Sequence, residues 1–411
     1  MNIDNNNFDI VIAGGGLAGC LMALSLAKLT KTNGELLQIA IVEKHGETDK
    51  HSHQLTFDER VLALSHGTAS YFADLGVWQN LSANANPIET IHISDRGYYG
   101  KARVYAKDHQ VDALGYVAPM KCIGLAIQES LALIQNSQSN NIHWFAPAQI
   151  EQLVWQKEQV TIQLSSNQLS SKVNLSAKLL LACDGAQSVC RKFANIHTTS
   201  KAYKQSAVIA NVTMAQAHQN IAYERFTEFG PIALLPLNDN MCSLVWTVAP
   251  EQAEQLTGIS DEEFIFKLNQ AFGFWQGGVN RVSQRFIYPL NLVQADENFY
   301  HRMALVGNAS HTIHPIAGQG FNLGVRDVSQ LAALIAEQLA QNKDIGSFAM
   351  LNHYGELRRD DQKQIINLTD SLVTLFSNTL PPLVAGRNIA LKVLNYCQPI
   401  KQAFVKKTMG Y

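Results

Sequence analysis

The N-terminal part of the chain alternates between strongly apolar runs and short glycine-rich or polar breaks. An apolar run at 8–13 leads into glycines, an almost wholly apolar stretch follows at 17–29, and a second apolar run at 37–42 ends at a glutamate. Continuous apolar runs are typical of buried parallel strands, and a segment that is apolar on all sides indicates a buried helix. The pattern therefore predicts a strand–helix–strand unit.

The middle of the chain has a different pattern. Residues 88–118, 142–165 and 206–250 contain short apolar runs separated by turn signals, as in antiparallel sheets. The runs GPIALLPL and MCSLVWTV flank one such turn and predict a hairpin. The α/β pattern returns at 177–185 and at 301–308. We therefore predict an α/β fold in which an antiparallel β-sheet layer is inserted into a doubly wound domain.

The last third of the chain favours helices. Apolar residues after position 319 recur at steps of three and four, which predicts a helix with a stripe formed by Val328, Leu331, Ile335 and Leu339. Beyond residue 347 the chain is expected to be mainly helical, with a break at LPPLVAG.

Composition and charge exclude several classes of protein. A formal net charge of -2 gives no general attraction to nucleic acid, and the six cysteines are scattered without a CxxC pair, as expected of reduced cytosolic thiols. The N-terminus lacks the basic and apolar regions of a secretory signal. No apolar run approaches the roughly 18 residues that span a bilayer. We expect a cytoplasmic protein, which could still lie on a membrane surface.

The first motif with a chemical meaning is Gly14-x-Gly16-x-x-Gly19, directly after a strand and at the start of a helix. Its glycines allow a tight turn, close approach of a diphosphate and close helix–strand packing. Glu43 ends the next strand 24 residues after Gly19, near the spacing expected of a ribose-binding acid. A glutamate suits a free 2′-hydroxyl, but it does not separate NAD from FAD.

Two later stretches extend this interpretation. LLLACDGAQSVCR contains Asp184-Gly185, which alone would be a common turn, followed by Ser188 and Arg191. VGNASHTIHPIAGQGFNLG then places four glycines around the start of a helix that we expect to begin near Gln319. A helix N-terminus favours a phosphate or a carbonyl that gains negative charge. Two such sites, far apart in the chain, indicate a cofactor longer than one nucleotide.

Together the three stretches resemble the fingerprints of FAD-dependent aromatic hydroxylases, the flavoprotein monooxygenases related to 4-hydroxybenzoate hydroxylase. HPIAGQGFNLGVRD is most similar to the ubiquinone-biosynthesis branch of this family. Within that branch, the Gly307-Asn308 pair and the stretches GPIALLPL and CSLVW most resemble 2-polyprenyl-6-methoxyphenol hydroxylases. The resemblance implies an FAD-binding Rossmann-like domain with an inserted antiparallel substrate domain and C-terminal helices. The expected division is 1–85, 119–200 and 296–345 for the FAD-binding domain, 86–118 and 201–295 for the substrate domain, and 346–411 for the helical region.

The resemblance also implies roles for individual residues. Gly14, Gly16 and Gly19 would hold the ADP diphosphate, and Glu43 the adenosine ribose. The other implied contacts of FAD are Arg60 near the diphosphate, Asp184 and Gly185 near the diphosphate and the path of the nicotinamide donor, Gly307 and Asn308 at the ribityl chain, and Gly318, Gln319, Gly320 and Asn322 at the pyrimidine edge of the flavin.

Asn308 departs from the family pattern, which has an aspartate at this position. An amide offers both a donor and an acceptor to a sugar hydroxyl, whereas a carboxylate only accepts. Losing the charge assistance of one hydrogen bond costs on the order of 1 kcal/mol. We therefore expect weaker FAD retention by several-fold and interpret Asn308 as a marker of a family branch.

Two histidines in the same stretch, His311 and His314, invite a metal interpretation, but no further ligand follows at a suitable spacing and Pro315 argues against a regular helix. We expect no metal site. His314 either faces the flavin or substrate, where it could help deprotonate a phenol, or is a loop histidine bonded to backbone. His314 and the flavin-edge residue Gln319 are the candidate catalytic residues.

The resemblance implies an FAD-dependent monooxygenase that uses O2 and NAD(P)H or another electron donor. It would hydroxylate a lipid-tailed phenol in ubiquinone biosynthesis through a flavin C4a-hydroperoxide. Other ubiquinone-biosynthesis proteins are possible partners, and the basic C-terminal helices suggest either solvated lysines or a peripheral membrane contact. Two alternatives stay open: a related hydroxylase acting on another ring position or a soluble aromatic, and a non-catalytic flavin-binding subunit.

Overall fold

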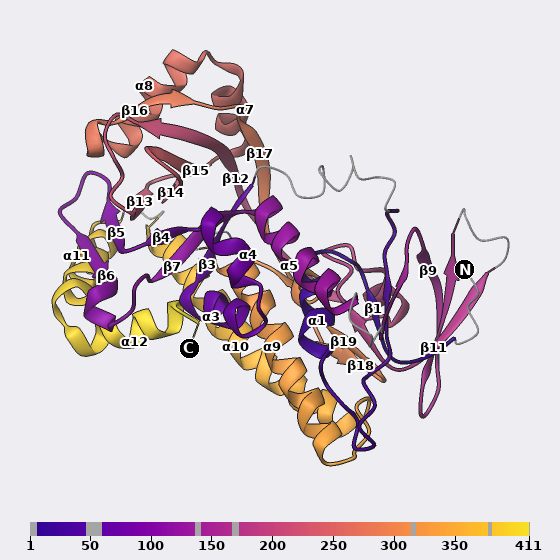
Figure 1. Cartoon of the computed structure of the whole chain (residues 1–411). Coiled ribbons are helices and arrows are strands. Elements are labelled where there is room, and N and C mark those ends of the chain that lie inside the picture. The colour runs from indigo at the N-terminus through magenta and orange to yellow at the C-terminus, as the bar shows by residue number, and fades with distance from the viewer. Residues whose placement is uncertain are drawn as a thin grey trace.

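The predicted strand–helix–strand unit is formed by β1 (Asn7–Ala13), α1 (Leu17–Leu26) and β2 (Ile39–Val42), and α1 is mostly buried. The computed structural model describes residues 6–46, 60–135, 141–166, 172–313, 318–376 and 380–410 (Figure 1). Strand β1 pairs in parallel with β2 on one side and with β11 (Val173–Ala182) on the other. The apolar runs therefore form the centre of a parallel sheet, as predicted.

This first sheet has the strand order β18–β19–β11–β1–β2–β8; in addition, β10 pairs antiparallel with β11, and β9 pairs antiparallel with β10. The additional strands are β8 (Ile142–Phe145), β9 (Gln149–Trp155), β10 (Val160–Ser165), β18 (Phe299–Tyr300) and β19 (Met303–Leu305). Ala13, Ala182 and Leu305 end three neighbouring parallel strands in register. All three glycine-bearing motifs therefore follow carboxyl ends at one edge of the sheet, where ligands bind in open α/β sheets.

Helices cover one face of this sheet and enclose its main core. They are α1, α3 (His66–Asp74), α4 (Trp78–Leu81), α5 (Met120–Gln135) and α9 (Gln319–Ala340). Helix α9 begins at Gln319, where a helix was predicted, and its expected apolar stripe, Val328, Leu331, Ile335 and Leu339, is buried. Helix α6 (Val189–Phe193) follows β11.

The second sheet has nine strands in the order β20–β17–β12–β15–β14–β13–β5–β6, with β16 beside β12. They are β5 (Thr90–Asp95), β6 (Lys101–Tyr105), β12 (Thr198–Met214), β13 (Ile221–Thr227), β14 (Gly230–Pro236), β15 (Met241–Val248), β16 (Val279–Val282), β17 (Phe286–Ala295) and β20 (His311–Thr312). The antiparallel pair β14–β15 confirms the predicted hairpin. Helices α7 (Pro250–Gly258) and α8 (Asp261–Phe272) pack on one face (Figure 1).

A small third sheet joins the two large ones. It contains β3 (Val61–Ser65), β4 (Asn86–Ile88) and β7 (Gly115–Pro119), with β7 in the centre. Residues 86–118, grouped as substrate-domain strands in the sequence, therefore contribute to two sheets: β4 and β7 belong to the small one, and β5 and β6 to the nine-stranded one.

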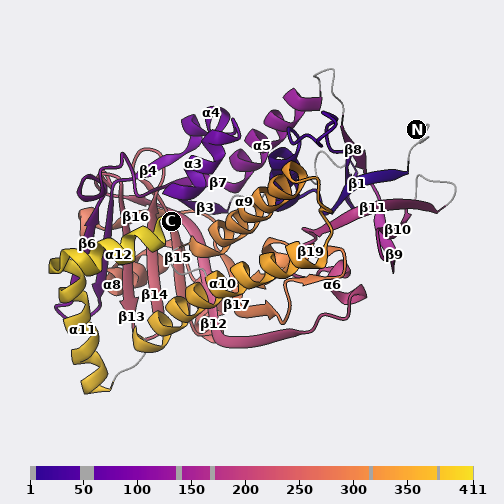
Figure 2. The ribbon, with the colours of Figure 1, turned by 90° about the horizontal axis from the view of Figure 1, so that it is seen from below.

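The C-terminal region is mainly helical, as predicted. Of the stretch LPPLVAG, where a break was expected, only Leu380 lies outside a helix, because the two prolines suit the first turn of α11. It contains α10 (Phe348–Phe376), α11 (Pro381–Tyr396) and α12 (Gln398–Thr408). Helix α10 runs beside α9, and α12 leads the chain back towards β3 (Figure 2). There the backbone N–H of Gly67 donates to the carbonyl oxygen of Met409 at 2.8 Å. No helix in the described part of the chain is long and apolar enough to cross a bilayer.

Candidate active site

One cavity of about 870 Å³ joins the carboxyl-end edge of the first sheet to the nine-stranded sheet. Its walls come from the loop after β1, the start of α9, strand β3, the face of the nine-stranded sheet opposite α7 and α8, and the C-terminal helices. The volume lies at the upper end of the range of about 300–1,000 Å³ that is typical of small-molecule sites. The predicted motif residues and the substrate-domain strands therefore share one space.

Three glycines shape the loop after β1 under different constraints. Gly14 has a φ of +99°, and a Cβ there would lie 2.6 Å from the carbonyl oxygen of Cys183. At Gly19 a Cβ would lie 1.9 Å from the carbonyl oxygen of Gly14, because α1 starts so close to β1. Gly16 lines the cavity, and a Cβ there would meet nothing within 4 Å. Open space beside the unpaired N–H groups that begin α1 fits a diphosphate.

Glu43 and Arg60 line the same end of the cavity. The Glu43 carboxylate accepts hydrogen bonds from the backbone N–H of Gly15 at 2.6 Å and of His45 at 3.0 Å. It thereby ties the end of β2 to the glycine loop and still faces the cavity. The Arg60 guanidinium lies 5.3 Å from the ring centroid of Tyr288 on β17, so it reaches from the small sheet to the nine-stranded one.

The start of α9 forms a second wall. Gly318 is the N-cap with a φ of +62°, and a Cβ there would lie 2.7 Å from the Cβ of Ala63. Gly318, Gln319 and Gly320 line the cavity and begin the helix, so their N–H groups have no intrahelical acceptor. The Asn322 side chain holds the start of α9 against β3: its amide donates to the carbonyl oxygens of Ala63 and Gly318 and accepts from the N–H of Ser65, each at 2.8 Å.

Asp184 and Gly185 follow β11 beside this loop. The Asp184 Oδ2 accepts the N–H of Cys190 at 3.0 Å, and Oδ1 is buried without a partner among the described residues. Gly185 lines the cavity with a φ of +79°. Arg191 is buried and donates to the carbonyl oxygens of Ala186 at 2.9 Å and Ala309 at 2.8 Å. Arg191 therefore fastens the Asp-Gly turn to the loop that carries Asn308.

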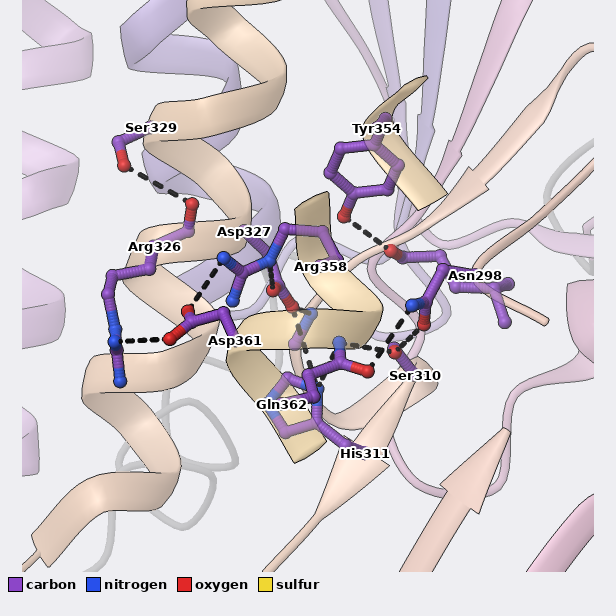
Figure 3. Close-up of polar contacts among 12 residues, drawn as sticks. Asn298, Ser310, His311, Arg326, Asp327, Ser329, Tyr354, Arg358, Asp361 and Gln362 are labelled. Atoms are coloured by element: carbon purple, nitrogen blue, oxygen red, sulfur yellow. Dashed lines mark hydrogen bonds and ion pairs between the residues drawn. The ribbon is translucent and has the colours of Figure 1, made fainter. Parts of the chain in front are cut away.

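The Gly307–Asn308 turn is held from behind by a buried ion pair. Gly307 donates its backbone N–H to Asp327 Oδ2 at 2.8 Å, and Arg358 Nε of α10 donates to Asp327 Oδ1 at 2.6 Å (Figure 3). Burial and the neighbouring carboxylates of Asp327 and Asp361 act in opposite directions on Arg358, and the net effect is a raised pKa. The Asn308 side chain is exposed and lines the cavity.

A hydrogen-bond network continues from Arg358 along α10 to Ser310 and to His311 of β20. Gln362 Nε2 lies 3.1 Å from Ser310 Oγ and 3.2 Å from His311 Nδ1, and Ser310 Oγ donates to Asn298 Oδ1 at 2.5 Å (Figure 3). His311 is buried, which lowers its pKa, so it belongs to this support. His314 lies outside the described residues. Within the described ranges, no three His, Cys, Asp or Glu side chains are grouped to hold a metal.

The opposite end of the cavity is apolar apart from a few groups on the sheet. Strand β13 turns Ala222, Glu224 and Phe226 towards it. Burial raises the pKa of the Glu224 carboxyl to about 7. No sequence pattern assigned a role to Glu224, Asp327 or Arg358, although Asp327 is the last residue of the stretch HPIAGQGFNLGVRD. Two of these residues could have been found in the sequence as charged residues at inward positions of apolar elements. Glu224 shares a strand face with an alanine and a phenylalanine, and Asp327 adjoins the buried stripe of α9.

Comparisons with known proteins agree with this geometry. The family described as FAD binding domain matches residues 7–369. The chain is 31% identical to ubiquinone hydroxylase UbiL of Rhodospirillum rubrum, over 98% of this chain and 89% of that protein. It is 28% identical to the human mitochondrial ubiquinone biosynthesis monooxygenase COQ6, over 97% of this chain and 92% of that protein.

Solved structures support the fold. The p-nitrophenol 4-monooxygenase PnpA of Pseudomonas putida superposes with a TM-score of 0.75 at 19% identity, covering 98% of each chain. PqsL of Pseudomonas aeruginosa, a probable FAD-dependent monooxygenase, gives a TM-score of 0.72 at 17% identity and covers 94% of this chain and 99% of that one. The α/β fold predicted from the sequence is confirmed. The chain therefore belongs to the FAD-binding-domain family of flavoprotein monooxygenases.

Proposed function

We propose that this protein hydroxylates the aromatic ring of a polyprenylated phenol, 2-polyprenyl-6-methoxyphenol, in ubiquinone biosynthesis. The observation that carries the proposal is the single cavity that connects the glycine loop after β1 and the start of α9 to an apolar sheet face. The names of the relatives UbiL and COQ6 supply the pathway. Such a cavity suits a cofactor at one end and an apolar ring at the other.

Most of the residues expected to hold FAD line the cavity, whereas Gly14, Gly19 and Asp184 are not among its lining residues. The N–H groups at the start of α1, beside Gly14, Gly16 and Gly19, suit the diphosphate, and Glu43 suits the ribose. The other proposed contacts are Arg60, Asp184, Gly185, Gly307, Asn308, Gly318, Gln319 and Gly320, with Asn322 acting by holding the Gly318 loop in place. When bound and reduced by NAD(P)H or another donor, FAD supplies the oxygen-transfer chemistry with O2.

The charges of the cavity favour a neutral ring over a soluble aromatic acid. An acid would need a cation near the sheet, and Arg225, Arg281 and Arg285 are not among the described residues that line the cavity. Arg60 does line it and reaches Tyr288 of the sheet, but we propose that it contacts the diphosphate of FAD. Arg387 of α11 does line it, but its guanidinium is paired with the buried Asp95, with Nε 2.7 Å from Oδ2. A ring carboxylate would also approach Glu224. A phenol with an apolar tail avoids both costs.

Helix α11 supports a peripheral membrane contact for such a lipid-tailed substrate. One side of the helix lines the cavity through Ala390, Leu391 and Leu394. Its other side exposes apolar side chains, among them Ile389 and Tyr396. A helix that is apolar outward as well as inward can rest on a lipid surface while its inner side faces the site. Lys401 of α12, by contrast, is buried and pairs with Asp108, so this lysine is not a solvated basic position.

The test of the function is a purified protein and a defined substrate. The protein should carry yellow FAD and convert 2-prenyl-6-methoxyphenol, with a reductant and O2, to a product that contains one additional oxygen. Deletion of the gene should cause a 6-methoxyphenol precursor to accumulate. A protein that FAD cannot reconstitute, or a deletion strain without redundant hydroxylases whose ubiquinone is unchanged, would contradict the proposal. Bound FAD without any hydroxylated product would favour an accessory flavin-binding subunit.

A further inference from the structure

We propose that Glu224 is the catalytic base of this site, accepting the proton of the substrate's phenolic hydroxyl within the cavity. The inference rests on the proposed function, since it requires a phenol in the cavity, and it assigns the reaction a residue that no sequence motif marks. It follows from where the carboxyl group lies, what surrounds it and which other groups share the space.

Glu224 is placed in the middle of the sheet wall. Along β13 its neighbours on the same face are Ala222 and Phe226, and across the sheet it pairs with Ile93 of β5 and Ala233 of β14. All four are apolar and all four line the cavity. A carboxylate surrounded by apolar side chains is costly to ionise unless a ligand accompanies it. The position is therefore unfavourable for folding alone and suited to a polar group on a substrate.

The two ends of β13 show where along the cavity this position lies. Ala222 packs with Ile88 and Val117 of the small sheet, which lies beside the start of α9. Phe226 stacks on Phe376 of α10, with ring centroids 3.8 Å apart. Glu224 therefore lies between the wall formed by the small sheet and the wall formed by the C-terminal helices, and the proposal places the hydroxyl of the ring there.

The other ionisable groups of the cavity leave Glu224 without a charged partner. Of the described lining residues, the carboxylates are Glu43 and Glu224, and the cationic or titratable groups are His45 and Arg60 at the nucleotide end, Tyr223 and Tyr288 on the sheet, Cys183 after β11 and Arg387 on α11. Arg387 is held by Asp95. Burial is the cause that raises the pKa of Glu224 to about 7, with no contribution from these charges.

The chemistry required is a single proton transfer. The phenolic O–H bond breaks, an O–H bond forms on the Glu224 carboxylate, and the substrate becomes a phenolate with a more electron-rich ring. The proton leaves to water when the product departs, which restores the carboxylate. A base whose pKa lies near the working pH is the most effective, and such catalysis typically contributes about 10²–10⁴-fold. An ordinary glutamate, with a pKa near 4.5, would be a weaker base for a phenol.

The experiment compares Glu224→Gln and Glu224→Asp with the wild type and with Glu228→Gln, which removes the same charge from the exposed turn after β13. FAD content and the Kd for 2-prenyl-6-methoxyphenol should stay within about threefold in all four proteins, because the amide still accepts or donates a hydrogen bond. Product formation should fall about 100-fold or more in E224Q. It should be partly retained in E224D and unchanged in E228Q.

Two further readouts separate a base from a structural residue. The rate of product formation in the wild type should fall on the acid side of about pH 7, and this limb should be absent in E224Q. Calorimetry of phenol binding in two buffers of different ionisation enthalpy should show protons exchanged near pH 7 in the wild type and none in E224Q. An E224Q protein with the wild-type acid limb and proton exchange would overturn the inference alone. A wild-type protein that neither binds nor hydroxylates phenols would overturn the proposed function as well.

Discussion

The two ends of the cavity are built from different parts of the polypeptide. The nucleotide end, where we propose that FAD binds, is formed mainly by backbone: glycine loops after β1 and β19 and the N–H groups at the start of α1 and α9, with side chains that hold those loops from outside. The sheet end consists of side chains on a regular surface, where cross-strand neighbours such as Ile93 and Ala233 define the wall. One end depends on the conformation of its loops, and the other on which side chain occupies each inward position.

The difference separates two kinds of constraint. At Gly14 and Gly19 a methyl group collides with backbone, so a substitution at either position changes the fold and the site together. On the sheet, Glu224 contacts the cavity, and a change there alters chemistry while the strands remain paired. We therefore expect variants at the nucleotide end to lose stability or FAD, and variants at the sheet end to lose chemistry and even gain stability.

The largest effect is expected from Asp327→Asn, which acts behind the nucleotide end. The change leaves the buried Arg358 with Asp361 as its remaining carboxylate partner and weakens the bond to the Gly307 N–H, at a cost of about 3–5 kcal/mol in the free energy of unfolding. Glu337→Ala, at an exposed position of the same helix, should change stability by less than about 0.5 kcal/mol. Denaturant unfolding measures both, and equal effects would show that the ion pair does not support the loop.

Next in size is a pair of glycine variants in one loop. Gly19→Ala should destabilise the protein by about 3 kcal/mol, since the new methyl group meets the Gly14 carbonyl oxygen. Gly16→Ala has room for its methyl group and should have the stability of the wild type. It should bind FAD about tenfold or more weakly, because the methyl group enters the space proposed for the diphosphate. FAD titration of the apoprotein tests this, and unchanged affinity in G16A would place the diphosphate elsewhere.

At the sheet end, Glu224→Gln should stabilise the protein at high pH. The folded carboxyl keeps its proton up to about pH 7, whereas the unfolded chain releases it near 4.5, so wild-type stability falls as pH rises through this window. Above pH 7 the variant should be more stable by up to about 3 kcal/mol, and the difference should vanish below about pH 4.5. Thermal unfolding across this pH range measures the difference, with E228Q as the control. If E224Q and E228Q showed the same pH dependence, the raised pKa of Glu224 would be contradicted.

The smallest effect concerns the residue that departs from the family pattern. Asn308→Asp should leave the Tm unchanged, because the side chain is exposed to the cavity. It should tighten FAD binding several-fold, since one hydrogen bond to the cofactor gains charge assistance worth about 1 kcal/mol. Weaker FAD binding in this variant would mean that a second negative charge near the diphosphate outweighs the hydrogen bond.

The same comparison explains what could be predicted from the sequence. Glycine spacing and apolar runs located the loops after β1 and β19 and the start of α9, because backbone geometry restricts the residue type at each position. The sheet order and the division of 86–118 between two sheets depend on pairing between distant segments, which no local pattern records. The support that Arg358 gives to the Gly307 loop and the position of Glu224 in the cavity likewise depend on contacts across the fold. In the sequence, each is visible only as a charged residue within an otherwise apolar pattern.

One contact has a consequence for how the protein is made. The hydrogen bond between Gly67 and Met409 places the end of α12 in the wall of a cavity whose opposite side begins at Gly15 and Gly16. Almost the whole chain separates these segments in order of synthesis. The cavity therefore cannot close before α12 has left the ribosome, and a ligand that contacts every wall binds only after that point. Completion of the cavity is then a late step of synthesis, separate from the folding of the first strands.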